Sequence, residues 1–342
     1  MKVTMKDIAD RLDISINAVS LALNNRAGVS DAMRLKILHT ADELGYLQKK
    51  AKYERTFMSA NLCIMMQRIY AKDMNFYGRV LYGASEEARR YGLDALINFF
   101  DDRDMQVPKS IEEHRVSGII VIGKINDENI RRLQAYHVPL VVVDHASLCH
   151  PLNCIVTDNK LGGFLQTQYL LEKGFEKIGF FGDLHYSLSI KERYFGFREA
   201  LDSRGLPGSE DLEGYIKRYS VTASCLEQGV LDDDREAGLQ LLKAAGELPE
   251  AFVCSNDKAA IYLMNLLRAL HYRVPADISV VGFDDIDLAE KFTPKLTTIH
   301  VHKGSMGRRA VQRLRYLQSH KESPPETAVM GVSLIERDSV KI

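Results

Sequence analysis

The stretch TMKDIADRLDISINAVSLALN, residues 4–24, decides how the N-terminal part of this chain folds. Thr4 stands where a helix N-cap is expected, Asp7 follows three residues later, and apolar residues recur at helical spacing. Asp13 falls at a turn, and Ser15 can cap a second helix. Two short helices joined by a tight turn are the module that places one helix in the major groove of DNA. Because any small helical bundle shows this periodicity, the stretch alone also fits a helical cap on a larger domain.

The second predicted helix has an apolar inner face and an outer face that is free to contact DNA. Ser30 can cap a third helix over residues 31–43, which completes a small bundle. We expect operator contacts from the outer face, from the helix caps and from the basic segment that follows the bundle. These candidates are Thr4, Ser15, Ile16, Asn17, Ser20, Leu21, Asn24, Lys49 and Arg55.

The wider pattern, from TMKDIADRL through AVSLALNN and GVS to ELGY, resembles the headpiece of the LacI/GalR family of bacterial transcription regulators. The chain departs from that family at Asp13, where glycine is usual, and at Leu21, where arginine is frequent. Arginine at the second position would reach guanine, whereas leucine can contact only thymine methyl groups, and Asn17 can pair with adenine. We therefore predict an operator half-site richer in A·T at the positions that Asn17 and Leu21 face.

Charge is distributed unevenly along the 342 residues, whose net charge is −1. Residues 1–58 hold ten lysines and arginines against seven acidic residues, and the surplus is concentrated in residues 49–55, where phosphates can be met. Five cysteines without C-x-x-C spacing indicate reduced thiols. No N-terminal signal and no run of eighteen apolar residues occurs, so we expect a cytoplasmic protein with no membrane partner.

Residues 48–60 form a polar, basic segment that we expect to be the hinge after a headpiece at residues 1–47. In the family that the headpiece resembles, a leucine of a short hinge helix enters the minor groove and kinks the DNA. Aligned from Tyr46, that position carries Arg55, which can enter a narrow minor groove, while Phe57 or Met58 can act as a wedge if the register shifts. We predict weaker or differently placed kinking.

From residue 61 onward, near-continuous apolar strands alternate with helices that end at glycine. This alternation is typical of parallel sheets covered on both faces, and about 280 residues exceed one such sheet, so two are expected. The expected strands are 61–66, 93–100, 118–122, 140–143, 177–181, 251–254 and 279–283, and the expected helices are 77–91, 127–136, 160–173, 190–204 and 257–270.

The segments VTDNKLGGFLQTQYLLEKGFEKIGFFGD, KERYFGFREAL, CSNDKAA and RVPADISVVGFDDIDLAEKFTPKLTTI resemble the core of the same family. That core is similar to periplasmic sugar-binding proteins. The resemblance implies an all-α helix-turn-helix headpiece followed by an α/β, periplasmic-binding-protein-like core of two doubly wound subdomains with parallel sheets, over residues 61–342. The expected N-subdomain spans about 61–158 plus 288–320, and the C-subdomain about 159–287 plus 321–342.

Effector contacts are expected at the carboxyl ends of the strands, where parallel sheets place ligands. Polyhydroxylated ligands need planar hydrogen-bonding groups and an aromatic face. Four positions match the binding motifs of the family, and two aromatic residues follow the first strand: Arg193, Asn256, Asp257, Asp284, Phe76 and Tyr77. For Asp257 we favour a structural role as a helix N-cap over ligand contact.

Enzyme and metal motifs are weak or absent in the sequence. The chain has no G-x-G-x-x-G after a strand, no phosphate loop and no G-x-S-x-G, so we expect no enzymatic activity and no cofactor. His145, Cys149, His150 and Cys154 resemble zinc ligands superficially, but their spacing is uncommon for zinc, and we favour a loop between two strands and no metal.

The resemblance implies an effector-responsive, DNA-binding regulator that acts as a homodimer on pseudo-palindromic operators. Its expected partners are double-stranded operator DNA and a small effector, most simply a sugar, and its expected role is repression of carbohydrate-utilisation genes. Two alternatives stay open: a sugar-binding protein without a DNA role, and a regulator that responds to a nucleoside or purine.

Overall fold

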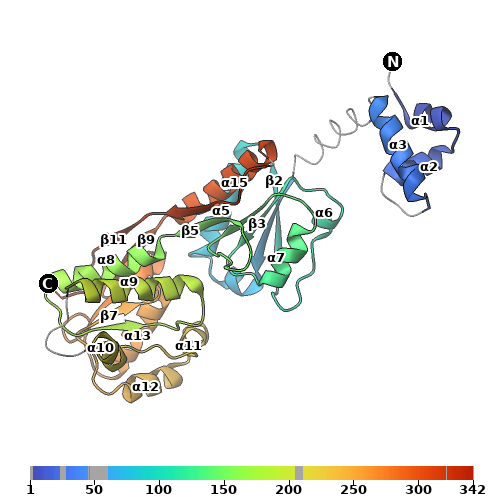
Figure 1. The fold of residues 1–342 in the computed structure, drawn as a ribbon. Helices are drawn as coiled ribbons and strands as arrows, with labels where there is room; N and C mark the ends of the chain where they lie inside the picture. Colours follow the sequence, from blue (N-terminus) through green and yellow to red (C-terminus); the bar gives the residue numbers. More distant parts are fainter. Residues whose placement is uncertain are drawn as a thin grey trace.

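The computed structural model describes residues 3–23, 28–44, 46, 61–204, 211–320 and 322–341. It contains a three-helix headpiece and an α/β core built on two sheets (Figure 1). The expected hinge, residues 48–60, lies outside the described residues, as do Asn24, Lys49 and Arg55. Within the described parts of the chain, no helix combines the length and the apolar character needed to span a bilayer.

The headpiece consists of α1 (Met5–Leu12), α2 (Ile16–Leu23) and α3 (Asp31–Glu43). The bounds of α3 are those expected from the sequence. The three helices share one small core, whose fully buried members are Ile8, Ala9, Val19, Ala22, Ile37 and Ala41. This core uses the inner face of α2 that the helical spacing predicts, and so leaves the opposite face of α2 for DNA.

The first sheet has six parallel strands in the order β10-β5-β4-β3-β1-β2. Along β1, alternate residues face opposite sides: Leu62, Ile64 and Met66 pack toward α5 and α15, whereas Cys63 and Met65 pack toward α6 and α7. The strands are β1 (Asn61–Gln67), β2 (Asp94–Phe100), β3 (Gly118–Ile122), β4 (Leu140–Val143), β5 (Asn153–Thr157) and β10 (Thr327–Met330). The helices beside this sheet are η1 (Arg68–Lys72), α5 (Tyr77–Arg90), α6 (Lys109–Glu112), α7 (Asp127–Gln134) and α15 (Lys303–Ser319).

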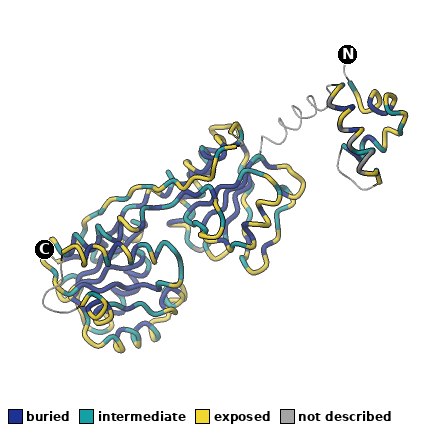
Figure 2. Tube along the Cα trace, in the orientation of Figure 1, coloured by how far each residue is buried: buried dark blue, intermediate teal, exposed yellow. Residues whose placement is uncertain are grey.

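The second sheet has five strands in the order β11-β9-β8-β7-β6, parallel except for the antiparallel pair β11 and β9. Its strands are β6 (Ile178–Phe181), β7 (Ala251–Cys254), β8 (Ser279–Asp284), β9 (Thr297–Val301) and β11 (Val332–Ile335). Its helices are α8 (Asn159–Glu172), α9 (Leu188–Arg204), α10 (Leu212–Tyr219), α11 (Leu226–Asp232), α12 (Arg235–Ala244), α13 (Asp257–Ala269) and α14 (Asp287–Lys291). Figure 2 shows buried residues along the strands of both sheets and exposed residues on the outer faces of the helices. The core therefore has two separately covered sheets, as expected.

The chain passes between the two subdomains at three places: between β5 and α8, between β9 and α15, and between β10 and β11. The backbone N–H of Asp158, in the first crossing, donates to the carbonyl oxygen of Met330, in the third, over 2.8 Å. The two crossings are thereby joined, so a change in the angle between the subdomains must move both.

These crossings differ from the division expected along the sequence. Residues 288–320 are expected in the N-subdomain, yet β9 lies in the second sheet beside β8. Residues 321–342 are expected in the C-subdomain, yet β10 lies in the first sheet beside β5. Strand pairing decides these memberships, and pairing between distant segments leaves no local pattern.

Candidate functional site

The start of α1 is fixed by Thr4 and Asp7. The backbone N–H and the Oγ1 hydroxyl of Thr4 donate to Asp7 Oδ2 over 2.6 and 2.8 Å, and these two bonds lower the pKa of Asp7. The result is the capping arrangement that the sequence predicts, with the carboxylate held at the positive end of the helix.

The turn between α1 and α2 depends on a left-handed residue. Asp13 has φ 54° and ψ 50°, and its N–H donates to the carbonyl of Ala9. Glycine adopts this conformation without strain, which explains physically why glycine suits the turn. Ser15 then starts α2, because its Oγ accepts a hydrogen bond from the N–H of Ala18 over 3.1 Å.

The outer face of α2 is exposed at its first turn and partly covered at its second. Ile16 is 48% exposed and Asn17 is also exposed, whereas Ser20 and Leu21 are half-buried. A Cβ added to Gly28 would lie 3.1 Å from Leu21 Cδ1, so the Leu21 side chain packs toward Gly28, shortly before α3. Ile16 and Asn17 therefore project furthest, and Leu21 projects less than the helical spacing suggests.

A chamber of about 350 Å³ lies between the two subdomains. The first subdomain contributes aromatic and acidic groups, and the second contributes most of the hydrogen-bonding groups. Its lining includes Ile69, Tyr70, Asp73, Phe76, Tyr77, Asp144, Tyr186, Ser187, Ser189, Arg193, Glu227, Asp232, Asn256, Lys258, Asp284 and Ile286. Five of the six residues predicted to bind effector are in this lining, and Asp257 is the exception.

Arg193, on α9, organises the floor of the chamber. It is 5% exposed, and its Nε donates to Asn159 Oδ1 over 3.0 Å, while one terminal nitrogen donates to the carbonyl of Ser255 over 2.6 Å. The other terminal nitrogen lies 3.3 Å from Asp284 Oδ1, and the guanidinium carbon is 3.6 Å from the centre of the Phe283 ring. Four contacts hold the guanidinium rigidly in one orientation, as ligand positioning requires.

Two helices must approach closely for Arg193 to sit where it does. A Cβ on Gly163, in α8, would overlap the carbonyl oxygen of Arg193, in α9. Glycine at position 163 therefore allows the backbones of α8 and α9 to touch. The second subdomain thus builds its ligand-facing arginine on a tightly packed helix pair.

Asp284 ends β8 in an unusual backbone conformation, with φ 112°. Lys303, at the start of α15, is 5% exposed, and its ammonium donates to the backbone carbonyls of Asp284 and Asp285. Burial raises the pKa of Asp284 to about 6, although Arg193 and Lys303 oppose the rise. Lys303, beside the crossing between β9 and α15, therefore fixes the backbone of Asp284, whose carboxyl lines the chamber.

Asn256 and Glu227 form a second polar group in the chamber wall. The side-chain oxygen of Asn256, Oδ1, caps α13 by accepting a hydrogen bond from the N–H of Ala259 over 2.9 Å. The side-chain nitrogen, Nδ2, donates to Glu227 Oε2 over 3.1 Å. Glu227 is 4% exposed, and its other oxygen accepts from Ser255 Oγ over 2.6 Å. Burial raises the pKa of Glu227. Asn256 therefore has both a structural role and a position on the chamber.

The aromatic wall is larger than the sequence predicts. Phe76 and Tyr77 lie in it, with their ring centroids 4.9 Å apart, and Tyr70 stacks on Tyr77 with centroids 4.3 Å apart. The Tyr77 hydroxyl donates to Asp144 Oδ2 over 3.1 Å, and burial raises the pKa of Asp144 to about 7. The wall therefore places three aromatic rings beside a carboxyl group.

The structure adds lining residues that the sequence analysis did not single out. Asp144 directly follows β4, and the rule applied to Asp284, a carboxylate at the end of a parallel strand, would have found it. Glu227 lies on α11, a helix that the sequence pattern does not predict, so no comparable signal marks it. Lys258 reaches Asp73 across the chamber over 2.8 Å, a contact between subdomains that local patterns cannot show.

Asp257 is fully buried behind the chamber. Its Oδ2 accepts from the N–H of Ile286 over 2.8 Å, and its Oδ1 accepts from the hydroxyl of Thr298. Asn256, not Asp257, is the N-cap of α13. The predicted structural role is thus of a different kind: Asp257 connects α13 to the loop after β8 and to β9.

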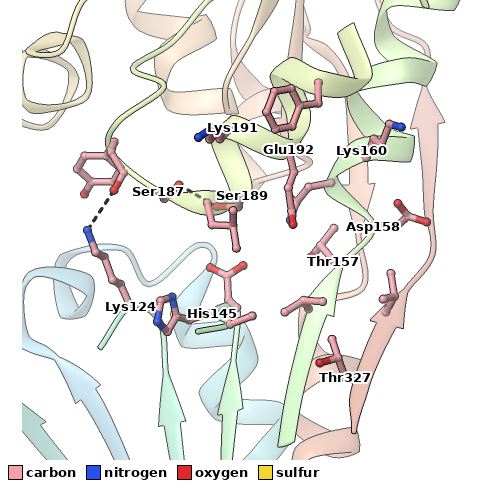
Figure 3. Close-up of a pocket in the computed structure, with 18 of the residues that line it drawn as sticks. Lys124, His145, Thr157, Asp158, Lys160, Ser187, Ser189, Lys191, Glu192 and Thr327 are labelled. Atoms are coloured by element: carbon pink, nitrogen blue, oxygen red, sulfur yellow. Dashed lines mark hydrogen bonds between the residues drawn. The ribbon is translucent and has the colours of Figure 1, made fainter. Parts of the chain in front are cut away.

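A second cavity of about 630 Å³, the side pocket, adjoins the chamber and shares six lining residues with it: Tyr70, Tyr77, Asp144, Tyr186, Ser187 and Ser189. Figure 3 shows Ser187, Ser189, Lys191 and Glu192 on one side, facing Lys124 and His145 on the other. Lys124 Nζ donates to the carbonyl of Tyr186 across the gap over 3.3 Å. The chamber thus opens into a wider polar space between the subdomains.

The residues between β4 and β5 form the loop that the sequence analysis favours over a zinc site. His145 lines the side pocket, Cys149 is exposed and Cys154 is buried in β5. Among the described residues, no three histidine, cysteine, aspartate or glutamate side chains lie close enough to hold a metal ion.

A helix-turn-helix headpiece joined to a two-lobed domain with a polar chamber between its lobes defines a DNA-binding regulator controlled by a small molecule. A model of bacterial regulatory proteins of the lacI family matches residues 4–48, and a model of the periplasmic binding protein-like domain matches residues 167–340. The chain therefore belongs to the LacI/GalR family of bacterial transcription regulators.

Individual relatives align along nearly the whole chain. The HTH-type transcriptional repressor PurR of Vibrio vulnificus (strain CMCP6) is 28% identical over 346 residues, which cover 99% of this chain and 98% of that protein. The structure of the transcriptional regulator CelR with cellobiose has a TM-score of 0.67 at 21% identity and covers 98% of this chain and 99% of that chain. The lac repressor dimer bound to operator and the anti-inducer ONPF has a TM-score of 0.64 at 22% identity, with 99% of each chain covered. The protein is a DNA-binding repressor of this family with an effector domain, and not an enzyme.

Proposed function

We propose that this protein represses carbohydrate-utilisation genes by binding pseudo-palindromic operators as a homodimer, and that a small sugar-like effector in the chamber controls its affinity for DNA. The observation that carries the proposal is the chamber itself. Its lining combines Arg193, Asn256 and Asp284 with the aromatic residues Phe76 and Tyr77. Planar hydrogen-bonding groups facing aromatic rings suit a molecule with hydroxyl groups and an apolar ring face.

The three crossings supply a route from the chamber to the relative position of the subdomains. Lys303 is the first residue of α15, directly after the crossing from β9. Its ammonium donates to the backbone carbonyls of Asp284 and Asp285. A ligand that engages the Asp284 carboxyl from the second subdomain and Tyr77 from the first would favour one angle between the lobes. Such differential binding to two states is what allosteric control of DNA affinity requires.

Apolar side chains on the outside of the first subdomain support a second copy as partner. Tyr82 on α5 is 68% exposed, and Ile97 and Phe99 on the edge strand β2 are each 45% exposed. Exposed apolar groups on neighbouring elements are typical of protein interfaces. A two-fold dimer would present two copies of α2 to a palindromic site.

A nucleoside or purine effector is the second candidate, and the Tyr70–Tyr77 stack favours it. These rings stack on each other with centroids 4.3 Å apart and both line the chamber, where a base could extend the aromatic stack. The relative named PurR adds support for testing this class. Both candidates use the same chamber, so one panel of ligands separates them.

The test starts from operator DNA obtained by in-vitro selection with the full-length protein. A gel-shift assay with sugars and nucleosides then measures which class changes operator affinity, and a thermal-shift assay measures direct binding. Asp284→Asn should abolish the response to the active ligand, whereas the matched control Asp202→Asn, an exposed residue of α9 outside the chamber, should retain it. A response that Asp284→Asn leaves intact would contradict binding in the chamber.

A further inference from the structure

The chamber carries a surplus of acidic groups. Its lining holds five carboxylates and two basic side chains among the described residues: Asp73, Asp144, Glu227, Asp232 and Asp284, against Arg193 and Lys258. The carboxylates come from both subdomains and from several separate elements. The surplus is therefore a property of the whole chamber and not of one acidic segment.

Both basic groups already have partners. Lys258 pairs with Asp73 over 2.8 Å. Arg193 donates to Asn159 and to the carbonyl of Ser255, and faces Asp284 with its remaining nitrogen. An anionic ligand that accepted from the remaining N–H groups of Arg193 or Lys258 would lie beside the carboxylate of Asp284 or Asp73, and like charges repel. The chamber thus offers no unoccupied cation to a phosphate or carboxylate.

Two of the carboxylates receive hydrogen bonds only from neutral groups. Glu227 accepts from Ser255 and Asn256, and Asp144 accepts from the Tyr77 hydroxyl. Neutral donors satisfy hydrogen bonding but do not balance a negative charge, and an unbalanced buried charge is unfavourable. Protons relieve part of this charge, since burial raises the pKa of Asp144 to about 7 and also raises that of Glu227.

We propose, building on the function proposed above, that the effector is a polyhydroxylated molecule carrying a protonated amine, such as an amino sugar, and that the chamber discriminates against phosphorylated and carboxylated sugars. An ammonium group would add positive charge beside Asp144 and Glu227, which otherwise share the charge of Arg193 with Asp284. The aromatic rings of Tyr70 and Tyr77 line the same cavity, and aromatic rings attract cations.

The lysines of the side pocket do not remove the surplus of acidic groups in the chamber. Lys160 pairs with Glu199 over 2.8 Å, and Lys124 donates to the carbonyl of Tyr186. Lys191 lies 5.9 Å from the centre of the Phe195 ring. These lysines adjoin the acidic groups Asp158 and Glu192. Of these three lysines, Lys160 has an acidic partner, whereas Lys124 and Lys191 face neutral groups. A long anionic ligand would still meet Asp144 and Glu227, which accept hydrogen bonds from neutral groups, in the chamber.

Binding of an amine should release a proton. The charged and titratable groups that surround Asp144 are Tyr70 and Tyr77 from the first subdomain, and Glu192, Arg193 and Asp284 from the second. An ammonium group placed among them favours the ionised form of Asp144 and lowers its pKa. Affinity for the amine should therefore rise between pH 6 and about pH 7 and fall again above about pH 8, where the ammonium of the ligand loses its own proton. Between pH 6 and pH 7 the binding enthalpy should depend on the ionisation enthalpy of the buffer.

The experiment uses matched pairs that differ in one charged group. Tris and pentaerythritol share three hydroxymethyl groups, and only Tris carries an ammonium; glucosamine, galactosamine and mannosamine are compared with their parent hexoses and the hexose 6-phosphates. With full-length protein in phosphate buffer at constant ionic strength, the thermal-shift assay should show stabilisation by Tris and by at least one amino hexose beyond its neutral partner. The phosphates should show none.

Glu227→Gln provides the matched variant, because glutamine keeps the shape and one acceptor for Ser255 while removing the charge. Because Glu227 also holds Asn256, affinity for both ligands can change, but affinity for the amine should fall roughly fivefold to tenfold more than affinity for the neutral partner. Glu236→Gln, an exposed residue of α12 outside the chamber, should behave like the wild type.

Each other result counts against the inference in a distinct way. A neutral hexose that binds and alters operator affinity more strongly than its amine overturns the inference and leaves the proposed function standing. A hexose phosphate that binds best overturns it also. If neither Tris nor any amino hexose stabilises the protein at millimolar concentrations, the chamber does not select cations. If a nucleoside alone binds and releases operator, both the inference and the sugar class fail.

Discussion

The outer face of α2 and the chamber are two recognition surfaces built on opposite principles. Ile16 and Asn17 project from a helix whose stability comes from its other face, through Val19 and Ala22 in the headpiece core. In the chamber, Arg193 is 5% exposed and also bonds to backbone and side chains of the fold. Substitutions on α2 can therefore change DNA specificity with little effect on folding, whereas substitutions in the chamber change folding and ligand binding together.

Removing Arg193 should produce the largest effect. Arg193→Ala leaves Asp284 and the carbonyl of Ser255 without their buried partner, so the free energy of unfolding of the core should fall by about 3–5 kcal/mol. Urea unfolding followed by far-UV circular dichroism measures this loss, and a gel shift with ligand should show no response. Arg235→Ala, at an exposed arginine of α12, is the control. Equal stability of the two variants would mean that Arg193 serves ligand binding alone.

Titration of the chamber should produce the next largest effect. The pKa of Asp144 is raised to about 7, so the folded protein binds an extra proton relative to the unfolded chain, whose aspartates titrate near pH 4. This contribution to stability is fully present below about pH 4 and is lost as the pH rises through about 7. Asp144→Asn mimics the protonated acid, so at pH 8 it should be more stable than the wild type by about 2–4 kcal/mol.

The measurement is urea unfolding of both proteins from pH 4 to pH 8. The pKa of Asp285 is shifted in the opposite direction from that of Asp144. Burial raises the pKa of Asp285, but hydrogen bonds from His300 and Arg337 lower it overall. The difference between wild type and Asp144→Asn isolates the chamber from that group. A difference that does not change with pH would contradict the predicted protonation.

Asn17→Ala tests the DNA side of the comparison. Loss of a bidentate contact to adenine should weaken binding to the selected operator by about 1–3 kcal/mol per half-site, with unchanged thermal stability. Fluorescence anisotropy with labelled operator measures the affinity. Asp10→Ala, an exposed residue of α1, is the control. A loss of binding that is equal for operator and unrelated DNA would show that Asn17 contacts phosphates and not bases.

The smallest effect is expected at the turn of the headpiece. Asp13 adopts φ 54°, so Asp13→Gly should stabilise the headpiece by about 0.5–1 kcal/mol, because glycine removes the strain of the left-handed conformation. Asp13→Ala removes the charge but keeps a Cβ, and should not stabilise the headpiece. Hydrogen exchange of residues 3–23 in the full-length protein separates these outcomes. Equal protection in both variants would assign the effect to charge.

Much of the secondary structure is predictable from local patterns. The bounds of α3, β3, β4 and β7 are those that the sequence predicts. A run of apolar residues between turn signals marks each of the three strands, and Ser30 marks the start of α3 as a helix cap. The short helices α10, α11 and α12 are not predicted. They follow one another without a strand between them, so the alternation of strand and helix does not mark them. Glu227, on α11, was missed for that reason.

The residues of the chamber also divide into those that the sequence predicts and those that only the structure places. Arg193, Asn256 and Asp284 were predicted from family motifs at the ends of strands, and the structure brings them to one chamber. Asp257 belongs to the same motif as Asn256 but points into the protein, toward Ile286 and Thr298. Neighbours in sequence at a helix start face different directions, so a motif alone does not say which one meets a ligand.

By itself, the sequence determined the class of the protein, the helices of the headpiece and most of the strands, because these follow from spacing and capping within short segments. Only the tertiary structure decided that β9 belongs to the second sheet and β10 to the first, that Lys303 holds the backbone of Asp284, and that Asp144 and Glu227 share a chamber with a single arginine. These facts depend on the pairing of strands across crossings and on contacts between elements that no local sequence pattern connects. Burial then sets the charge balance of the chamber, and burial is a property of the folded molecule rather than of any stretch of the chain.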